Sequence, residues 1–172
     1  MAGTHRLKPD TGIRDCRLQQ ECHPIRSFHN SVAFLTGAAG GIGLGMAHAF
    51  ATQGIKLALA DVDADRLADV QRQFKAAGHD VLVFALDVGN RTALKQAVAQ
   101  VVEHFGALNI VCANAGVAGF FGPLQDGSEA DWDWVVDVNL KGAVNTVQAC
   151  LPYLLDQPAK AHIVLTSSIS GL

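Results

Sequence analysis

The stretch TGAAGGIG, residues 36–43, decides which fold we expect for this chain. It overlaps the end of VAFLT (32–36), a short apolar run typical of a buried strand, and it leads into a predicted helix over residues 41–54. Its glycines Gly37, Gly41 and Gly43 follow the spacing G-x-x-x-G-x-G. Because glycine has no Cβ, the backbone can turn tightly here and approach a bound group closely.

The same succession of apolar strand, turn and helix recurs along the chain. Further strands are predicted at 56–61, 80–87, 108–114 and 162–167, and further helices at 64–77, 91–105 and 132–155. Asp63 and Asn90 are suited to cap two of these helices, and Ser128 with Asp131 is suited to start the last one. The strands are nearly continuous apolar runs, which indicates burial on both faces. The predicted fold class is therefore α/β, a doubly wound parallel sheet of the Rossmann type with strand order 3-2-1-4-5.

Composition limits the class of protein further. The chain has 172 residues, of which 49% are hydrophobic and 17% are charged, which suits one globular domain with a substantial core. Residues 31–172 carry the repeated pattern and are expected to form this domain. Residues 1–30 lack periodicity, and we expect a disordered or loosely attached tail. The net charge of -3 and the pI of about 6.1 provide no basic field for nucleic acid or for an anionic membrane.

Targeting and metal-binding signals are weak in this sequence. No apolar run reaches the ~18 residues that a membrane helix needs, and the amino-terminal stretch has no apolar core of a secretory signal. Cysteines 16, 22, 112 and 150 form no C-x-x-C pair, and their spacing matches no zinc pattern. We therefore expect a cytoplasmic protein without a metal site, in which Cys112 and Cys150 are small core residues.

The ends of the predicted strands carry the candidates for ligand contacts, because ligands of such sheets bind outside the carboxyl ends of the strands. The helix that follows the glycine loop directs N–H groups and partial positive charge at an anion such as a pyrophosphate. Asp61 ends the second strand, where a carboxylate can accept both hydroxyls of an adenosine ribose and repels a 2′-phosphate. The alternatives are a tight turn without a ligand for the loop and a helix cap for Asp61, although Asp63 is better placed to cap.

Six motifs in order and at matching spacing resemble those of the short-chain dehydrogenase/reductase family: TGAAGGIG, the strand-terminal Asp61, LDV (86–88), NAG (114–116), VNLKG (138–142) and LTSSISG (165–171). The resemblance covers residues 31–172 and implies a Rossmann-type fold that uses NAD(H) or NADP(H) to interconvert alcohols and carbonyls. It implies that Asp61 selects NAD. It also implies a set of cofactor-binding residues: Thr36, Gly37, Gly41, Ile42, Gly43, Asp61, Asp87, Val88, Asn114, Ala115 and Gly116.

The resemblance also implies two catalytic residues, Asn139 and Ser168. For Asn139 the alternative is a buried polar residue that braces its helix against the fourth strand. For Ser168 the alternative is a hydroxyl that caps a turn at a strand end. The family's Tyr-x-x-x-Lys pair follows the catalytic Ser, and this sequence ends at Leu172 without one. Tyr153 precedes Ser168 and has Gln157 four positions later, so we expect it to be a packing residue.

These observations predict an NAD-dependent oxidoreductase that interconverts a secondary alcohol and a ketone and is inactive as the chain stands. The expected fold is C-terminally incomplete, and a truncated gene product, a partial gene model and half of a split protein all remain open. Phe120 and Phe121 favour an apolar small-molecule substrate, with packing of the loop as the alternative, and the complete form is expected to be a homo-oligomer. The alternative functions are a non-catalytic NAD-binding module and a subunit completed by a partner chain.

Overall fold

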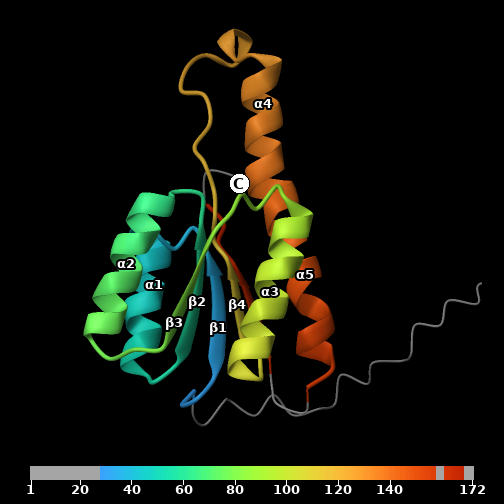
Figure 1. The fold of residues 1–172 in the computed structure, drawn as a ribbon. Coiled ribbons are helices and arrows are strands. Elements are labelled where there is room, and N and C mark those ends of the chain that lie inside the picture. Colours follow the sequence, from blue (N-terminus) through green and yellow to red (C-terminus); the bar gives the residue numbers. More distant parts are fainter. Residues whose placement is uncertain (1–27, 158–160, 169–172) are drawn as a thin grey trace, which may run out of the picture.

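The computed structural model describes residues 28–157 and 161–168, and its centre is a five-stranded parallel sheet (Figure 1). The spatial order is β3-β2-β1-β4-β5, which confirms the predicted order. The strands are β1 (Val32–Thr36), β2 (Lys56–Asp61), β3 (Val81–Ala85), β4 (Ile110–Ala113) and β5 (His162–Leu165).

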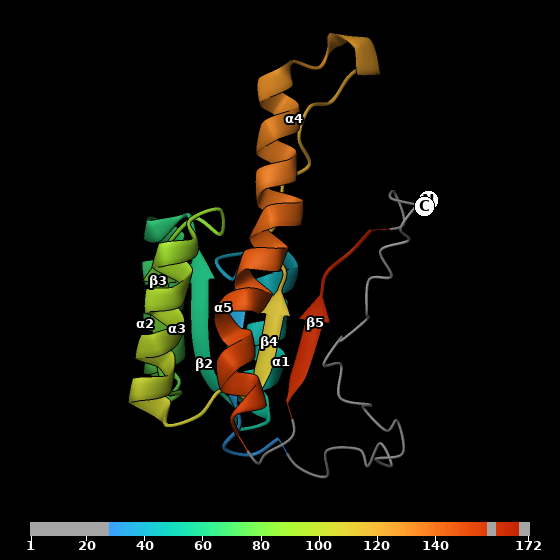
Figure 2. The ribbon, with the colours of Figure 1, turned by 90° about the vertical axis from the view of Figure 1, so that its right-hand side faces the viewer.

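Helices cover both faces of this sheet (Figures 1 and 2). Alternate residues of β1 show the two layers: Ala33 and Leu35 pack in the core shared with α1 (Gly41–Thr52) and α2 (Ala64–Ala76). Val32 and Phe34 pack in the core shared with α3 (Arg91–Phe105) and α5 (Ala143–Leu155). Because side chains alternate along a strand, a strand between two helical layers must be apolar at every position.

The helix ends follow the predicted local signals. Asp63 caps α2 and Asn90 caps α3, each by accepting hydrogen bonds from backbone N–H groups of the first turn. Ser128 and Asp131 form a capping box at the start of α4 (Glu129–Val135). Gly54, Gly78 and Gly106, which follow α1, α2 and α3, have positive φ angles of 71°, 82° and 77°. A left-handed residue of this kind ends a helix, and glycine adopts it without a Cβ clash.

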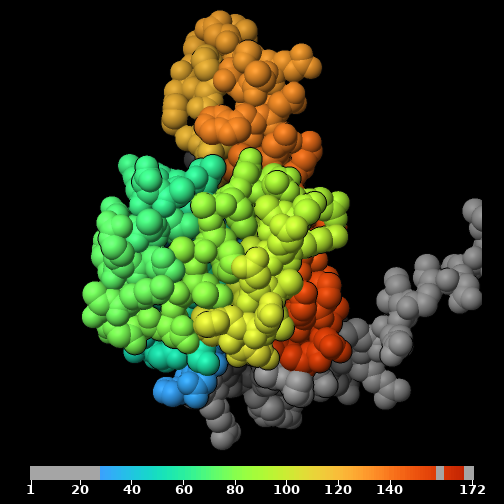
Figure 3. Space-filling model, viewed as in Figure 1, coloured from blue at the N-terminus to red at the C-terminus, as the bar shows by residue number. Residues whose placement is uncertain are grey.

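The long helix predicted over 132–155 is present, but it is not α-helical throughout. The structure has α4, then a π-helical segment η2 (Val136–Gly142), then α5, and a short 3-10 helix η1 (Leu124–Asp126) precedes them. The π-helical segment ends at Gly142, which packs closely against Val88. A Cβ at Gly142 would overlap the Val88 side chain, so this close packing requires glycine. α4 and the loop before it extend beyond the carboxyl ends of the strands, as the ribbon and the space-filling view show (Figures 1 and 3).

Three strands, β3, β4 and β5, end before the predicted residue, and the chain passes into loops there. After β3, for example, the N–H of Gly89 donates to the carboxylate of Asp87 at 2.8 Å, which turns the chain. β5 lies at the edge of the sheet, and its Leu165 side chain is 58% exposed. For the predicted tail, residues 1–27 lie outside the described residues, and Asn30 is attached to Gly54 through a backbone hydrogen bond.

Candidate functional site

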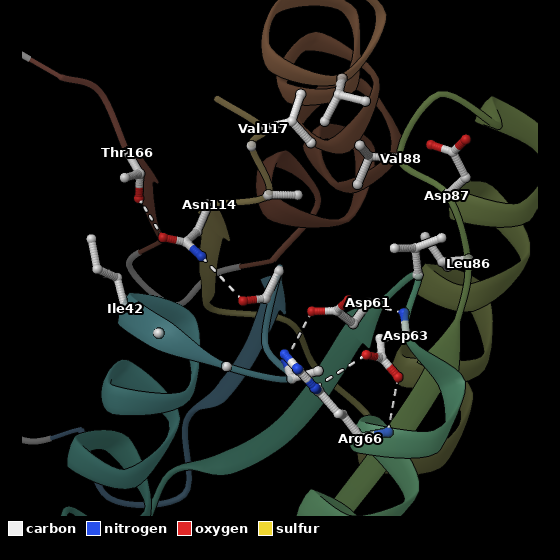
Figure 4. Close-up of a pocket in the computed structure, with 18 of the residues that line it drawn as sticks. Ile42, Asp61, Asp63, Arg66, Leu86, Asp87, Val88, Asn114, Val117 and Thr166 are labelled. Carbon is white, nitrogen blue, oxygen red and sulfur yellow. Dashed lines mark hydrogen bonds and ion pairs between the residues drawn. The ribbon is translucent and has the colours of Figure 1, made fainter. Parts of the chain in front are cut away.

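A cavity of about 520 Å³ lies at the carboxyl ends of the strands, between α1, α2 and the helix that contains η2 (Figure 4). Because β1 pairs with both β2 and β4, chain connections leave in opposite directions at this point, which is where open α/β sheets bind ligands. The cavity brings together most of the predicted cofactor residues: Gly37, Gly41, Ile42, Asp61, Asp87, Val88, Asn114, Ala115 and Gly116.

Glycines shape the loop on one side of the cavity. Gly37 has φ +66°, and a Cβ there would lie 2.9 Å from the Cα of Ala115. Gly41 also has a positive φ, of +51°. A Cβ at Gly43 would overlap the carbonyl oxygen of Gly37. Gly43 does not line the cavity, so its contribution is to let the first turn of α1 pack against the loop.

The amino end of α1 faces the cavity and has no side-chain cap. Gly40 stands at the N-cap position without a capping hydrogen bond, and the first turn contains no acidic residue. By contrast, α2, α3 and α4 are each capped by a side chain. Gly40, Gly41 and Ile42 line the cavity directly. The backbone N–H groups of this turn and the helix dipole therefore provide a site for an anion.

Asp61 presents its carboxylate to the cavity from the end of β2. One oxygen, Oδ2, accepts a hydrogen bond from the N–H of Ala39 at 2.8 Å, and Oδ1 accepts from the N–H of Asp63 at 3.1 Å. These bonds orient the carboxylate and connect it to the glycine loop. Asp63, and not Asp61, is the cap of α2.

Thr36 and Asn114 join the ends of β1 and β4. The hydroxyl of Thr36 accepts from the N–H groups of Asn114 at 3.0 Å and Ala115 at 3.1 Å. The Asn114 side chain donates to the carbonyls of Thr36 and Gly37 and accepts from the hydroxyl of Thr166 at 2.9 Å. Thr36 is 1% exposed and does not line the cavity. Both residues therefore hold the walls of the cavity in place.

On the opposite side, Val88 and Asp87 form the wall beside β3. The side-chain amide of Asn145, on α5, donates to the carbonyls of Val88 at 3.1 Å and Gly89 at 3.4 Å. Asn145 is buried, so these bonds satisfy its side-chain nitrogen as well as holding the loop in place.

The two predicted catalytic residues, Asn139 and Ser168, are not among the residues that line the cavity. Asn139 lies on η2, and its side chain accepts from the N–H of Val117 at 2.8 Å and donates to the carbonyl of Val117 at 2.9 Å. Asn139 is exposed, so the alternative of a buried brace against the fourth strand was wrong; it braces the loop after that strand. Ser168 is exposed beyond the end of β5, and Thr166 is the residue of that segment that lines the cavity.

Arg66, Trp134 and Thr166 also line the cavity and were missed by the sequence analysis. The position of Arg66 in the sequence could have indicated its place in the site, because it lies in the first turn of the helix that follows Asp61. Trp134 and Thr166 belong to segments distant in sequence, and only the fold brings them here.

Other candidate chemical groups lie in the core. Cys112 and Cys150 are buried, and burial raises the pKa of the Cys112 thiol to about 11 and that of the Cys150 thiol to about 12. Both thiols are therefore protonated near neutral pH. Tyr153 packs against the α3–α5 core, as predicted. Residues 28–157 and 161–168 contain no group of three or more His, Cys, Asp and Glu side chains that could hold a metal ion.

In the same described ranges, none of the helices has the length and apolar character needed to cross a membrane.

Comparison with known proteins agrees with the fold and the motifs. The family model of the short chain dehydrogenases matches residues 31–172. A CLA biosynthesis dehydrogenase/reductase of Lactiplantibacillus plantarum is 32% identical over 148 residues, which are 86% of this chain and 51% of that protein. A C alpha-dehydrogenase of a Sphingobium species is 31% identical over 147 residues, 86% of this chain and 48% of that protein. The chain thus spans about half the length of these curated relatives.

Comparison with solved structures identifies the same family. The crystal structure of a short chain dehydrogenase/reductase from Burkholderia phymatum in complex with NAD is 39% identical, with a TM-score of 0.82. That match covers 84% of this chain and 51% of the other chain. By sequence and by structure, the chain belongs to the short-chain dehydrogenase/reductase family.

Proposed function

We propose that residues 31–172 bind NAD(H) in preference to NADP(H), as the cofactor-binding part of an oxidoreductase that interconverts a secondary alcohol and a ketone. The observation that carries the proposal is that one cavity contains both the uncapped amino end of α1 and the oriented carboxylate of Asp61. The first suits the pyrophosphate, and the second suits the two hydroxyls of an unphosphorylated ribose. Bound NAD would accept or supply the hydride.

The other predicted residues have supporting roles in this proposal. Asp87 and Val88 lie at the adenine end, and Asn114, Ala115 and Gly116 lie towards the nicotinamide. Asn139 holds the loop at Val117, which lines the cavity, and the Ser168 hydroxyl donates a hydrogen bond to the substrate oxygen. A cytoplasmic location and a homo-oligomeric complete form stay predictions from the sequence.

An apolar substrate remains part of the proposal. A second hollow, of about 210 Å³, lies between the loop after β4 and α4, and apolar side chains form most of its wall: Ala118, Phe120, Leu124, Trp132 and Val135. Phe121 is 85% exposed on the same loop. Apolar walls of this kind bind apolar groups by removing their surface from water.

Titration calorimetry with NAD and NADP tests the cofactor preference. We expect NADP to bind more weakly by about one to two decades, because its 2′-phosphate and the Asp61 carboxylate are like charges. Asp61→Asn keeps an oxygen that can accept from the N–H of Ala39 but removes the charge. This variant should therefore reduce the difference in affinity between NAD and NADP. Asp65→Asn, in the first turn of α2 and outside the cavity, should leave the difference in affinity between the two cofactors unchanged. Equal binding of both cofactors by the unmodified chain would refute the preference.

A second test concerns turnover. We expect a polypeptide of these 172 residues to show no measurable oxidation of secondary alcohols or reduction of ketones, followed by NADH absorbance. The reason is that a serine hydroxyl is a poor proton donor near neutral pH, and a positioned acid/base contributes roughly 10²- to 10⁴-fold to the rate. Where the coding DNA continues beyond Leu172 into a Tyr-x-x-x-Lys segment, the extended chain should be active.

Turnover by the shorter polypeptide would overturn this assignment of the proton transfer. An extended chain that binds NAD and remains inactive would instead favour the alternative, a non-catalytic NAD-binding module.

A further inference from the structure

In addition to Asp87, the proposed adenosine end of the cavity carries three charged side chains, of which only Asp61 was expected to contact the cofactor. Asp61, Asp63 and Arg66 all line the cavity at this end (Figure 4). Arg66 lies against Asp63: its Nε is 3.3 Å from Asp63 Oδ2, and its backbone N–H donates to Asp63 Oδ1 at 3.0 Å. Asp63 therefore interacts with Arg66 in two ways: one carboxylate oxygen caps α2 at the Arg66 backbone N–H, and the other pairs with the Arg66 guanidinium.

The position of Arg66 matters because a guanidinium is the side chain best suited to a phosphate. Under the proposed function, the 2′-phosphate of NADP would be placed beside Asp61, at the same end of the cavity. Arg66 is 74% exposed at its side chain and Asp63 is 42% exposed, so the pair faces solvent and can rearrange. Without a partner, Arg66 would be available to a 2′-phosphate and would offset the repulsion from Asp61.

We propose that Asp63 is a specificity-determining residue: by pairing with Arg66 it withholds this cation from a 2′-phosphate, and so strengthens the preference for NAD. Together Asp61, Asp63 and Arg66 carry a net charge of one negative unit, and Asp87 adds a further carboxylate to the cavity wall. Removal of the Asp63 charge makes this group of three neutral and leaves Arg66 without its counter-ion. This inference rests on the proposed binding of a dinucleotide in the cavity.

Asp63→Asn is the variant that separates the two functions of Asp63. Asparagine is about as good an N-cap as aspartate, so α2 keeps its cap while the charge is lost. Arg66→Gln removes the guanidinium, and the double variant combines the two changes. Asp65→Asn is the matched control, because it removes one charge from the first turn of the same helix at a residue outside the cavity.

The experiment measures the dissociation constants of NAD and NADP for the full chain and the four variants by calorimetry, at low and at high potassium chloride. We expect Asp63→Asn to tighten NADP binding by about tenfold, with NAD binding changed by less than about threefold. The gain should vanish in the double variant and shrink at high salt, where exposed charges are screened. Asp65→Asn should leave the ratio of the two constants as in the unmodified chain.

Other outcomes overturn the inference. An unchanged ratio in Asp63→Asn, or a gain that survives in the double variant, means that Arg66 does not serve the phosphate. Equal weakening of both cofactors by Arg66→Gln means that the guanidinium contacts the adenine instead. Binding of neither cofactor by the unmodified chain refutes the proposed function itself, and the inference with it.

Discussion

At the scale of single residues, the tightest backbone approach of the site lies under Gly43, where a Cβ would overlap the Gly37 carbonyl oxygen. We expect Gly43→Ala to lower the free energy of unfolding by about 2–3 kcal/mol, in the range of overpacked cores, and to abolish dinucleotide binding. Gly45→Ala is the matched control, since nothing lies within 4 Å of its added Cβ and alanine favours the helix by up to ~1 kcal/mol. Urea unfolding measures both. Equal free energies of unfolding for the two variants would show that the close contact between Gly37 and Gly43 does not require glycine at position 43.

At the scale of elements, the joint between β1 and β4 depends on the hydroxyl of Thr36, which accepts two backbone N–H groups and donates to the carbonyl of Cys112 at 3.4 Å. Thr36→Val keeps the shape and leaves these buried groups without a partner. We expect a loss of about 2–3 kcal/mol in the free energy of unfolding. Thr36→Ser keeps the hydroxyl and should lose no more than about half of that. Chemical unfolding of both variants decides the matter, and a Val variant as stable as the Ser variant would contradict the role of the hydroxyl.

At the scale of the whole molecule, apolar surface remains exposed along β5 and on the outer side of α5. Ile163, Val164 and Leu165 are 41%, 44% and 58% exposed on the edge strand, and Val144 on α5 is 46% exposed. Unpaired edge groups and apolar patches favour association, so we expect these 172 residues to form concentration-dependent oligomers that bind a hydrophobic dye. Val164→Lys should weaken the association, and Val62→Lys, which changes an exposed valine away from the edge, should not. Size-exclusion chromatography with light scattering is the measurement, and a dye-free monomer at all concentrations would contradict this expectation.

Local patterns in the sequence were enough to predict the strands and the caps at Asp63 and Asn90, because these rest on interactions within one turn or one strand. The general rules of doubly wound sheets then gave the strand order, and the family resemblance gave nine of the 19 residues that line the cavity. A strand that is apolar throughout must lie between two layers, and a glycine loop between a strand and a helix must lie at the carboxyl edge of the sheet.

Only the tertiary structure decided the rest of the site. Trp134 and Thr166 reach the cavity from segments distant along the chain, and Asn139 braces an exposed loop from a π-helical turn that the regular apolar pattern concealed. The pairing of Asp63 with Arg66 is a local i,i+3 contact, but only the fold places this pair in the wall of the cavity. The physical reason is that such contacts depend on distances between elements, which are determined by packing across the whole core, whereas periodicity and caps report only on neighbours along the chain.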